Sequence, residues 1–242
     1  MRRCVALAAT LLLVHAAAWA DPGYYVISPY DREGVLSTEL RYWSVKPHDD
    51  GETDWPELGI SYGVNSRWTT LLLASYIGSH ADATVPSSIS WQNEVLLTQG
   101  QWPLDIALHL SAIHLQGKRP GDGIEFGPVL QTNAGRMQIN ANLLFERDRK
   151  RGAWGPAMMK YQWQLRWHGW RWLQPGVQGF GELGPWNDTL ALDAQSHRAG
   201  PALFATLPPG GEHAVQWQLA WLLGKTYGER GAMFSTRLLL PF

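Results

Sequence analysis

The sequence predicts an all-β fold, namely a closed antiparallel transmembrane β-barrel of about twelve strands. Three observations predict it. Oily and polar side chains alternate with a period of two over segments of about ten residues, the length of a tilted membrane-spanning strand. Charged residues make up only 17% of a chain that contains 14 tryptophans. No apolar run after residue 20 is long enough for a helical span, so strands are left as the means of crossing.

The first twenty residues have the organisation of a secretory signal peptide. Arg2 and Arg3 precede an apolar run from Val5 to Ala18, and Ala18-Trp19-Ala20 supplies small residues for cleavage. We therefore expect cleavage near Ala20, which leaves residues 21–242 as the barrel. The only cysteine, Cys4, lies in the segment that is removed. Disulfides and thiolate chemistry are thus excluded from the mature chain.

The alternation is clearest in three segments, where oily residues hold every second position and amide or charged residues hold those between: Met137–Glu146, Ala157–His168 and Val215–Leu223. The remaining segments fit less cleanly, but turn residues separate them at similar intervals. The twelve predicted strands cover about 36–42, 56–63, 68–77, 88–98, 106–116, 124–133, 137–146, 157–168, 172–183, 197–207, 215–223 and 231–242.

The connections between these strands alternate in length. Short turns lie near residues 64–66, 100–103, 134–136, 168–170 and 208–211, and longer, more charged connections lie between them. Short periplasmic turns and longer outer loops are typical of outer-membrane barrels. This arrangement places both chain ends in the periplasm and makes residues 21–33 an N-terminal periplasmic segment.

The inward face of the predicted strands is polar and carries both signs of charge. We expect it to line a lumen that is either a narrow wet channel or a plugged interior. Balanced charges argue against strong ion selectivity, and a net charge of −1 gives no indication of a nucleic-acid partner. The predicted lumen-lining residues are Glu39, Arg41, Gln92, Glu94, His109, Glu125, Gln131, Gln138, Asn140, Asn142, Lys160, Gln162, Gln164, Arg166, Gln178, Glu182, Gln216, Gln218 and Arg237.

The end of the chain resembles the C-terminal signal of bacterial outer-membrane proteins. The sequence from Phe234 to Phe242 is a last strand with apolar or aromatic residues at alternate positions and a terminal Phe, although Pro241 departs from the usual penultimate pattern. The resemblance implies insertion into the outer membrane of a Gram-negative bacterium by the barrel-assembly machinery, with Phe242 as the assembly signal. It also implies contact with outer-membrane lipid, and the basic loop 147–151 is a candidate contact for lipopolysaccharide.

A second, narrower likeness lies in the hairpin from Leu58 to Trp68, with its Tyr-Gly-Val-Asn turn. It resembles hairpins of small proteobacterial outer-membrane channels, including the phenol-degradation MetA-pathway group. That likeness implies transport of small solutes, with hydrophobic and aromatic compounds among them. The expected function is therefore passive, narrow-channel transport without a catalytic residue, a metal or a cofactor.

Two alternatives remain at this stage. The outer-membrane phospholipase family places a His and a Ser two residues apart on one strand, and His109-Leu110-Ser111 has that spacing. This chain departs from the family's following Asn-Gly and turns both side chains toward the lumen, which puts a lipid hydrolase in doubt. The other alternative is a structural barrel without transport. The eight histidines show no metal-ligand spacing.

Overall fold

The computed structural model describes residues 24–30, 33–47, 51–79, 81–117, 120–208, 213–226 and 229–242. The predicted signal peptide, residues 1–20, lies outside these ranges. No helix within them is long and apolar enough to cross a membrane. The described residues form the strands β1 (Leu36–Pro47), β2 (Thr53–Asn65), β3 (Trp68–Ser79), β4 (Val85–Leu96), β5 (Asp105–Leu115), β6 (Gly121–Ala134), β7 (Met137–Lys150), β8 (Ala153–Trp154), β9 (Met158–Trp167), β10 (Leu173–Pro185), β11 (Ser196–Leu207), β12 (Val215–Thr226) and β13 (Glu229–Pro241).

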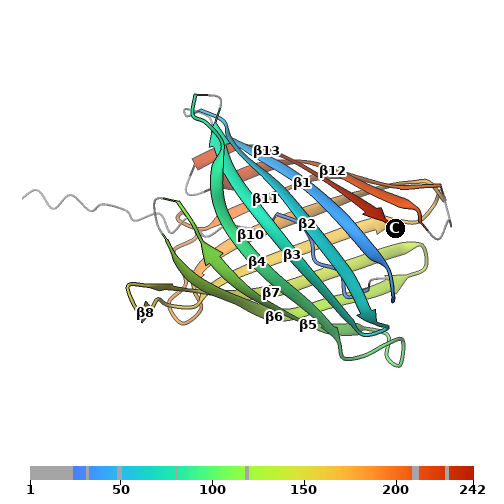
Figure 1. Cartoon of the computed structure of the whole chain (residues 1–242). Helices are drawn as coiled ribbons and strands as arrows, with labels where there is room; N and C mark the ends of the chain where they lie inside the picture. Colours follow the sequence, from blue (N-terminus) through green and yellow to red (C-terminus); the bar gives the residue numbers. More distant parts are fainter. Residues whose placement is uncertain are drawn as a thin grey trace, which may run out of the picture.

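All of these strands except β8 join in one closed antiparallel barrel (Figure 1). Each strand pairs with its neighbour in the chain, and β1 pairs with β13 from Ser37↔Pro241 to Pro47↔Gly231. This last ladder closes the ring, so no strand edge is left without a backbone partner in the membrane. The short β8 pairs only with the end of β7. The predicted fold class, a closed antiparallel barrel of about twelve strands, is confirmed.

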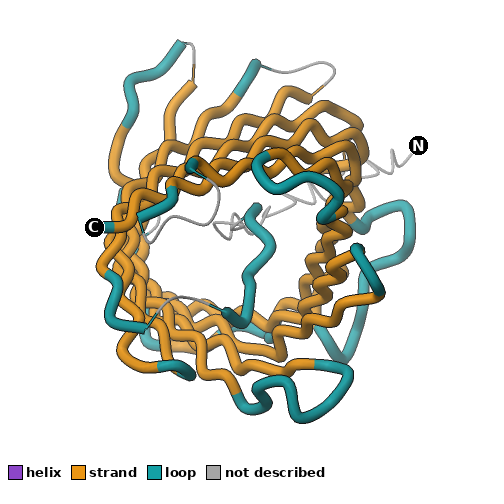
Figure 2. The backbone as a smooth tube through the Cα atoms, turned by 90° about the vertical axis from the view of Figure 1, so that its right-hand side faces the viewer, coloured by secondary structure: helices purple, strands orange, loops and turns teal. Residues whose placement is uncertain are grey.

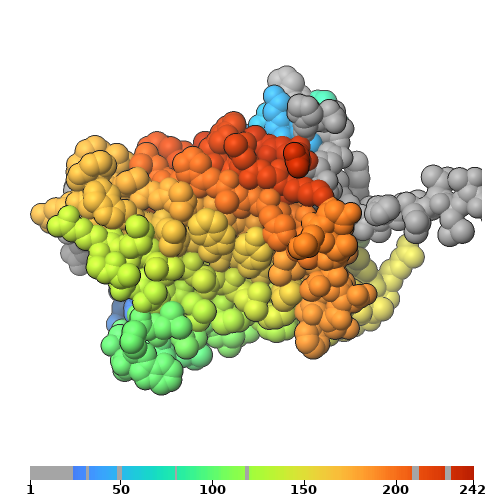
Figure 3. Space-filling model, turned by 180° about the vertical axis from the view of Figure 1, so that it is seen from behind, coloured from blue at the N-terminus to red at the C-terminus, as the bar shows by residue number. Residues whose placement is uncertain are grey.

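The two-residue alternation separates an oily outer face from an inner one. Trp91 and Trp221 are 55% and 52% exposed, whereas Gln178 and Asn140, on the inner face, are almost completely buried. Figure 3 shows the outer wall from behind, where neighbouring strands from β6 to β12 form a continuous surface. The Trp163 ring lies on this outer face and covers Gly179 of the neighbouring strand. A Cβ atom added to Gly179 would lie 2.5 Å from the ring. The outer surface therefore presents apolar side chains to acyl chains.

The two rims of the barrel differ less in loop length than the sequence predicts. We call the rim where β13 ends and β1 begins the C-terminal rim, and the rim that carries β8 the opposite rim (Figure 1). At the opposite rim Arg147–Lys150, expected in a loop, extend β7, and only residues 227 and 228 separate β12 from β13. The expectation of a long connection holds for residues 186–195 between β10 and β11. It fails at β7 and β12, where backbone pairing continues through charged residues, as in Asp122↔Arg149.

The interior is not polar throughout. Part of the interior holds what we call the aromatic cluster: Tyr24, Tyr25, Val26, Trp43, Val45, Trp55, Phe180, Ala202, Phe204, Ala220, Leu222 and Met233. The rings of Trp43 and Trp55 stack at 3.8 Å between centroids, and Tyr24 meets Trp43 edge-on at 4.6 Å. The expectation of a polar inward face omitted these residues. Alternation along the strand could have identified the members that lie on strands, because residues two apart share a face. Trp43, for example, lies on the same side of β1 as Glu39 and Arg41.

The N-terminal segment Tyr24–Tyr30 lies inside the barrel, as the teal segment within the ring of strands in Figure 2 shows. The Ile27 N–H donates to Gln162 Oε1 at 3.2 Å, and Asn142 Nδ2 donates to the Ile27 carbonyl at 3.0 Å. The Ser28 hydroxyl donates to Gln131 Oε1 at 3.3 Å. The sequence assigned residues 21–33 to an N-terminal periplasmic segment, without placing any of them inside the lumen. The structure instead places residues 24–30 in the lumen, where wall amides satisfy the backbone N–H and carbonyl of Ile27. Which side of the membrane each rim faces stays a prediction.

Candidate functional site: the lumen and its cavity

Every residue that the sequence assigned to the lumen is buried or half-buried in the structure. These side chains are not evenly spread over the wall. They form three charged groups and one network of amides, and part of the set faces a cavity.

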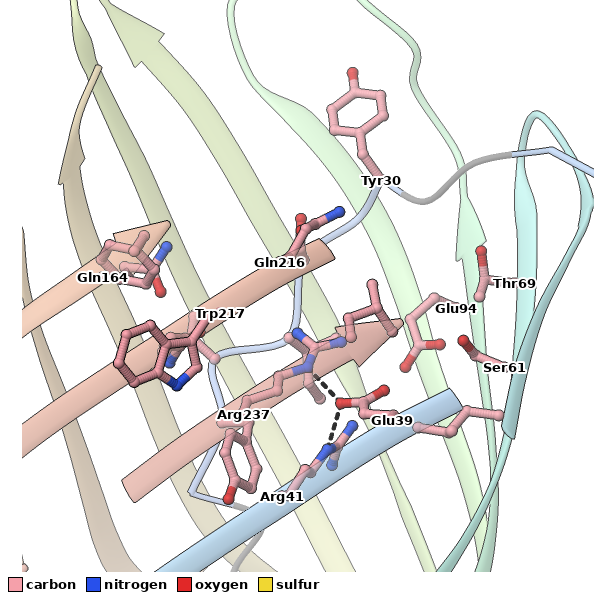
Figure 4. Close-up of a pocket in the computed structure, with 18 of the residues that line it drawn as sticks. Tyr30, Glu39, Arg41, Ser61, Thr69, Glu94, Gln164, Gln216, Trp217 and Arg237 are labelled. Carbon is pink, nitrogen blue, oxygen red and sulfur yellow. Dashed lines mark hydrogen bonds and ion pairs between the residues drawn. The ribbon is translucent and has the colours of Figure 1, made fainter. Parts of the chain in front are cut away.

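The first charged group joins β13, β1 and β2. It contains Glu39, Arg41 and Arg237, which Figure 4 shows, together with Glu57. Arg41 and Arg237 lie directly opposite each other in the β1–β13 ladder, a register that would be repulsive by itself. The Glu39 carboxylate accepts a hydrogen bond from Arg41 Nε and forms an ion pair with Arg237, and so offsets this repulsion. Glu57 lies 4.0 Å from Arg41 and completes a neutral set. Sequence reasoning missed Glu57 because no alternation was resolved in its strand.

The second charged group is a chain of side chains across five strands. His109 Nδ1 lies 2.9 Å from Glu94 Oε1, and its Nε2 lies 3.2 Å from Glu125 Oε1. Lys160 then joins Glu125, at 2.6 Å, to Glu146. The His109 ring is fully buried between two carboxylates, each of which attracts an N–H donor.

This arrangement does not support the hydrolase alternative. A general base needs a free ring nitrogen that can accept a proton from the serine hydroxyl. Both nitrogens of His109 face glutamates, and Ser111 Oγ is buried without a hydrogen-bond partner in the part of the chain that the structure describes. The pair therefore lacks the contact that would activate Ser111 as a nucleophile.

The third charged group holds the start of the N-terminal segment. The Arg198 guanidinium pairs with Glu182 and lies 4.1 Å from the centre of the Tyr24 ring. The Tyr24 hydroxyl donates to the same Glu182 carboxylate at 3.0 Å, and Arg198 Nη1 donates to Thr226 Oγ1 at 3.2 Å. Arg198, which the sequence did not indicate, therefore holds Tyr24 against the wall through a cation–π contact with its ring.

The amide network surrounds the middle of the same segment. Asn140 Nδ2 donates to Gln131 Oε1 at 2.9 Å, and Asn142 Nδ2 donates to Gln162 Oε1 at 3.0 Å. Primary amides both donate and accept, so they satisfy one another and the backbone of the segment without adding charge. Beside this network, Gln218 of β12 donates to Gln178 of β10 at 2.9 Å.

A cavity of about 160 Å³ lies between residues 25–30 and the wall, in the half of the barrel next to the C-terminal rim. A water needs roughly 10–15 Å³ on this measure, so the cavity has room for on the order of ten waters or one small solute. Figure 4 shows charged and amide side chains converging on it from several strands. Of the predicted lumen residues, ten line it: Glu39, Arg41, Gln92, Glu94, Gln138, Gln164, Arg166, Gln216, Gln218 and Arg237.

The other predicted lumen residues do not line this cavity. They belong to the charged groups and the amide network: His109, Glu125, Gln131, Asn140, Asn142, Lys160, Gln162, Gln178 and Glu182. Within the described ranges no three His, Cys, Asp or Glu side chains are placed to hold a metal ion.

Comparison with known proteins identifies the fold of this chain but assigns the chain to no family. No protein-family model and no curated protein matches the sequence. Among solved structures, the KdgM porin is 9% identical with a TM-score of 0.56, covering 85% of this chain and 99% of that one. An outer-membrane channel from Pseudomonas putida F1 is 11% identical with a TM-score of 0.52, covering 92% of this chain and 100% of that one.

The β domain of the Bordetella autotransporter BrkA is likewise similar, at 12% identity and a TM-score of 0.52, covering 87% of this chain and 100% of that one. The chain thus has the fold of bacterial outer-membrane β-barrels. At these identities the likeness extends to the fold alone, and the narrower likeness to the phenol-degradation group stays a prediction.

Proposed function

We propose that the chain is a narrow passive channel for small solutes in the outer membrane of a Gram-negative bacterium. The observation that carries the proposal is the polar cavity between the N-terminal segment and the wall of a closed barrel. An enclosed interior of amides and paired charges is favourable to water and polar solutes, whereas the outer face is favourable to lipid. The segment Tyr24–Tyr30 narrows the passage from within.

The proposal includes the route to the membrane. Residues 1–20 act as the export signal with cleavage near Ala20, and the barrel-assembly machinery reads the end of β13. Phe242 suits this role because it is 62% exposed, and its N–H donates to the Leu36 carbonyl at 2.9 Å beside the closing ladder. Arg149 and Arg151 are exposed at the opposite rim, which supports contact of loop 147–151 with anionic lipopolysaccharide.

Two measurements test the proposal in turn. Membrane fractionation followed by gel mobility with and without heating tests insertion and barrel closure, and we expect a heat-modifiable band in the outer-membrane fraction. Single-channel recording in planar bilayers then tests transport, and we expect a small conductance. Purified, heat-modifiable barrel that passes no current and does not swell liposomes in sugar solutions would overturn the channel and leave a structural barrel.

A further inference from the structure

The charges that face the cavity do not balance. Arg41, Arg166 and Arg237 line it together with two carboxylates, Glu39 and Glu94. Glu39 is already bound by two arginines, and Glu94 is bound by His109. The cavity wall therefore has an excess of positive charge, although the chain as a whole is close to neutral.

The excess is located at Arg166, near the end of β9. Its Nε donates to the neutral Gln174 side chain, and its guanidinium carbon lies 4.9 Å from the centre of the Phe204 ring. Arg41, Arg198 and Arg237 each pair with a glutamate, whereas Arg166 makes no ion pair within the described ranges. A guanidinium has five N–H donors, and the contacts of Arg166 leave most of them available to a solute.

The surroundings of Arg166 suit an anion. Gln164 faces the same cavity and can donate hydrogen bonds to a solute, whereas the Gln138 amide, which also lines it, already donates to Gln131 and Asn140. Gln138 lies opposite Arg166 in the β7–β9 ladder, and Phe204 covers the guanidinium plane from β11. A half-buried guanidinium without a counter-charge is stabilised by a carboxylate, because the two carboxylate oxygens can accept two parallel hydrogen bonds from its planar set of N–H donors.

We propose that the cavity contains an anion subsite at Arg166 that binds the carboxylate of a small organic acid. The inference rests on the proposed channel function and adds the class of solute to it. It also refines the expectation, drawn from the sequence, that balanced charges argue against strong ion selectivity. Arg41 and Arg237 lie with Glu39 and Glu57, and Arg198 pairs with Glu182, so these two groups are neutral. The group around Lys160 holds three glutamates, and Arg166 stays a separate cation among the described residues.

The test uses purified barrel in detergent micelles and trifluoroacetate as the probe, with ¹⁹F transverse relaxation as the readout. We expect the protein to raise the relaxation rate of trifluoroacetate and excess sodium acetate to reverse the effect. Losing one charge-assisted contact in Arg166→Gln should weaken binding about tenfold. The matched control is Arg171→Gln, which removes an exposed arginine from the turn after β9 and should bind as the wild type does.

Arg166→Lys provides a second measurement if Arg166→Gln does not fold. This variant keeps the positive charge but lacks the planar N–H donors of a guanidinium. Its affinity for trifluoroacetate should therefore fall between those of the wild type and Arg166→Gln. Unchanged binding by a folded Arg166→Gln or Arg166→Lys variant, or equal binding of neutral trifluoroethanol, would overturn the anion subsite. Conductance of the same preparation separates the two proposals: current without binding rejects the subsite alone, and binding without current supports the subsite and rejects the channel.

Discussion

Replacing Lys160 with methionine should destabilise the barrel more than any surface lysine substitution. The Lys160 ammonium joins Glu125 to Glu146, and its side chain is only 10% exposed. Methionine has a similar length and fills the same space, so the main change is the loss of charge. Glu125 keeps its contact with His109, but Glu146 has no other ion pair within the described residues. Removing one partner of a buried pair costs about 3–5 kcal/mol, more than a hundredfold in the unfolding equilibrium.

Lys150→Met is the matched control. Lys150 pairs with Asp148 at 2.7 Å, but its side chain is 42% exposed at the opposite rim. Exposed pairs contribute about 0.2–1 kcal/mol, so the control should unfold close to the wild type. Urea titration of the barrels in phospholipid vesicles, followed by tryptophan fluorescence and by heat-modifiable gel mobility, measures both. The reasoning is refuted if Lys160→Met loses no more stability than Lys150→Met.

Three other results are expected. Trp43→Ala removes a fully buried ring that stacks on Trp55, and should cost about 3–5 kcal/mol in the same titration, well above Trp221→Ala on the outer face. Deleting residues 24–30 should raise single-channel conductance several-fold, and an unchanged conductance would show that the segment does not narrow the passage. Burial and the Asp105 carboxylate raise the pKa of Tyr30 to about 12 from its model-peptide value of 10.0, so its stabilising effect should be present below pH 10 and be lost as pH rises through about 12. Ultraviolet titration should show this pKa fall in Asp105→Asn, with Tyr30→Phe identifying the signal.

The strands were predictable because alternation is a local property. Each predicted strand overlaps a strand of the structure. The sequence of a segment such as Met137–Glu146 indicates both that it is a strand and which side chains lie on its oily and polar faces. Strand ends were less predictable. Residues 147–149 look like a loop by composition, yet they continue the β6–β7 ladder, since hydrogen bonding between backbones does not depend on oily side chains.

The contacts within the lumen were not predictable in the same way. Parity along β1 and β13 shows that Glu39, Arg41 and Arg237 face inward, but not that Glu39 lies between the two arginines. That contact depends on the stagger of two strands almost two hundred residues apart, which places Arg41 opposite Arg237. Arg166 could be assigned to the lumen from its position, but its lack of a carboxylate partner appears only when every other pair is placed.

The sequence by itself determined that this chain forms strands with one oily and one polar face, and that these strands close into a barrel. Both follow from a repeat of two residues and from the need to pair every backbone group in lipid. Only the tertiary structure decided that residues 24–30 enter the lumen, that a cluster of aromatic and aliphatic side chains occupies part of it, and that one arginine faces the cavity without a counter-charge. These features depend on which distant side chains the barrel brings into contact, and no local pattern encodes that.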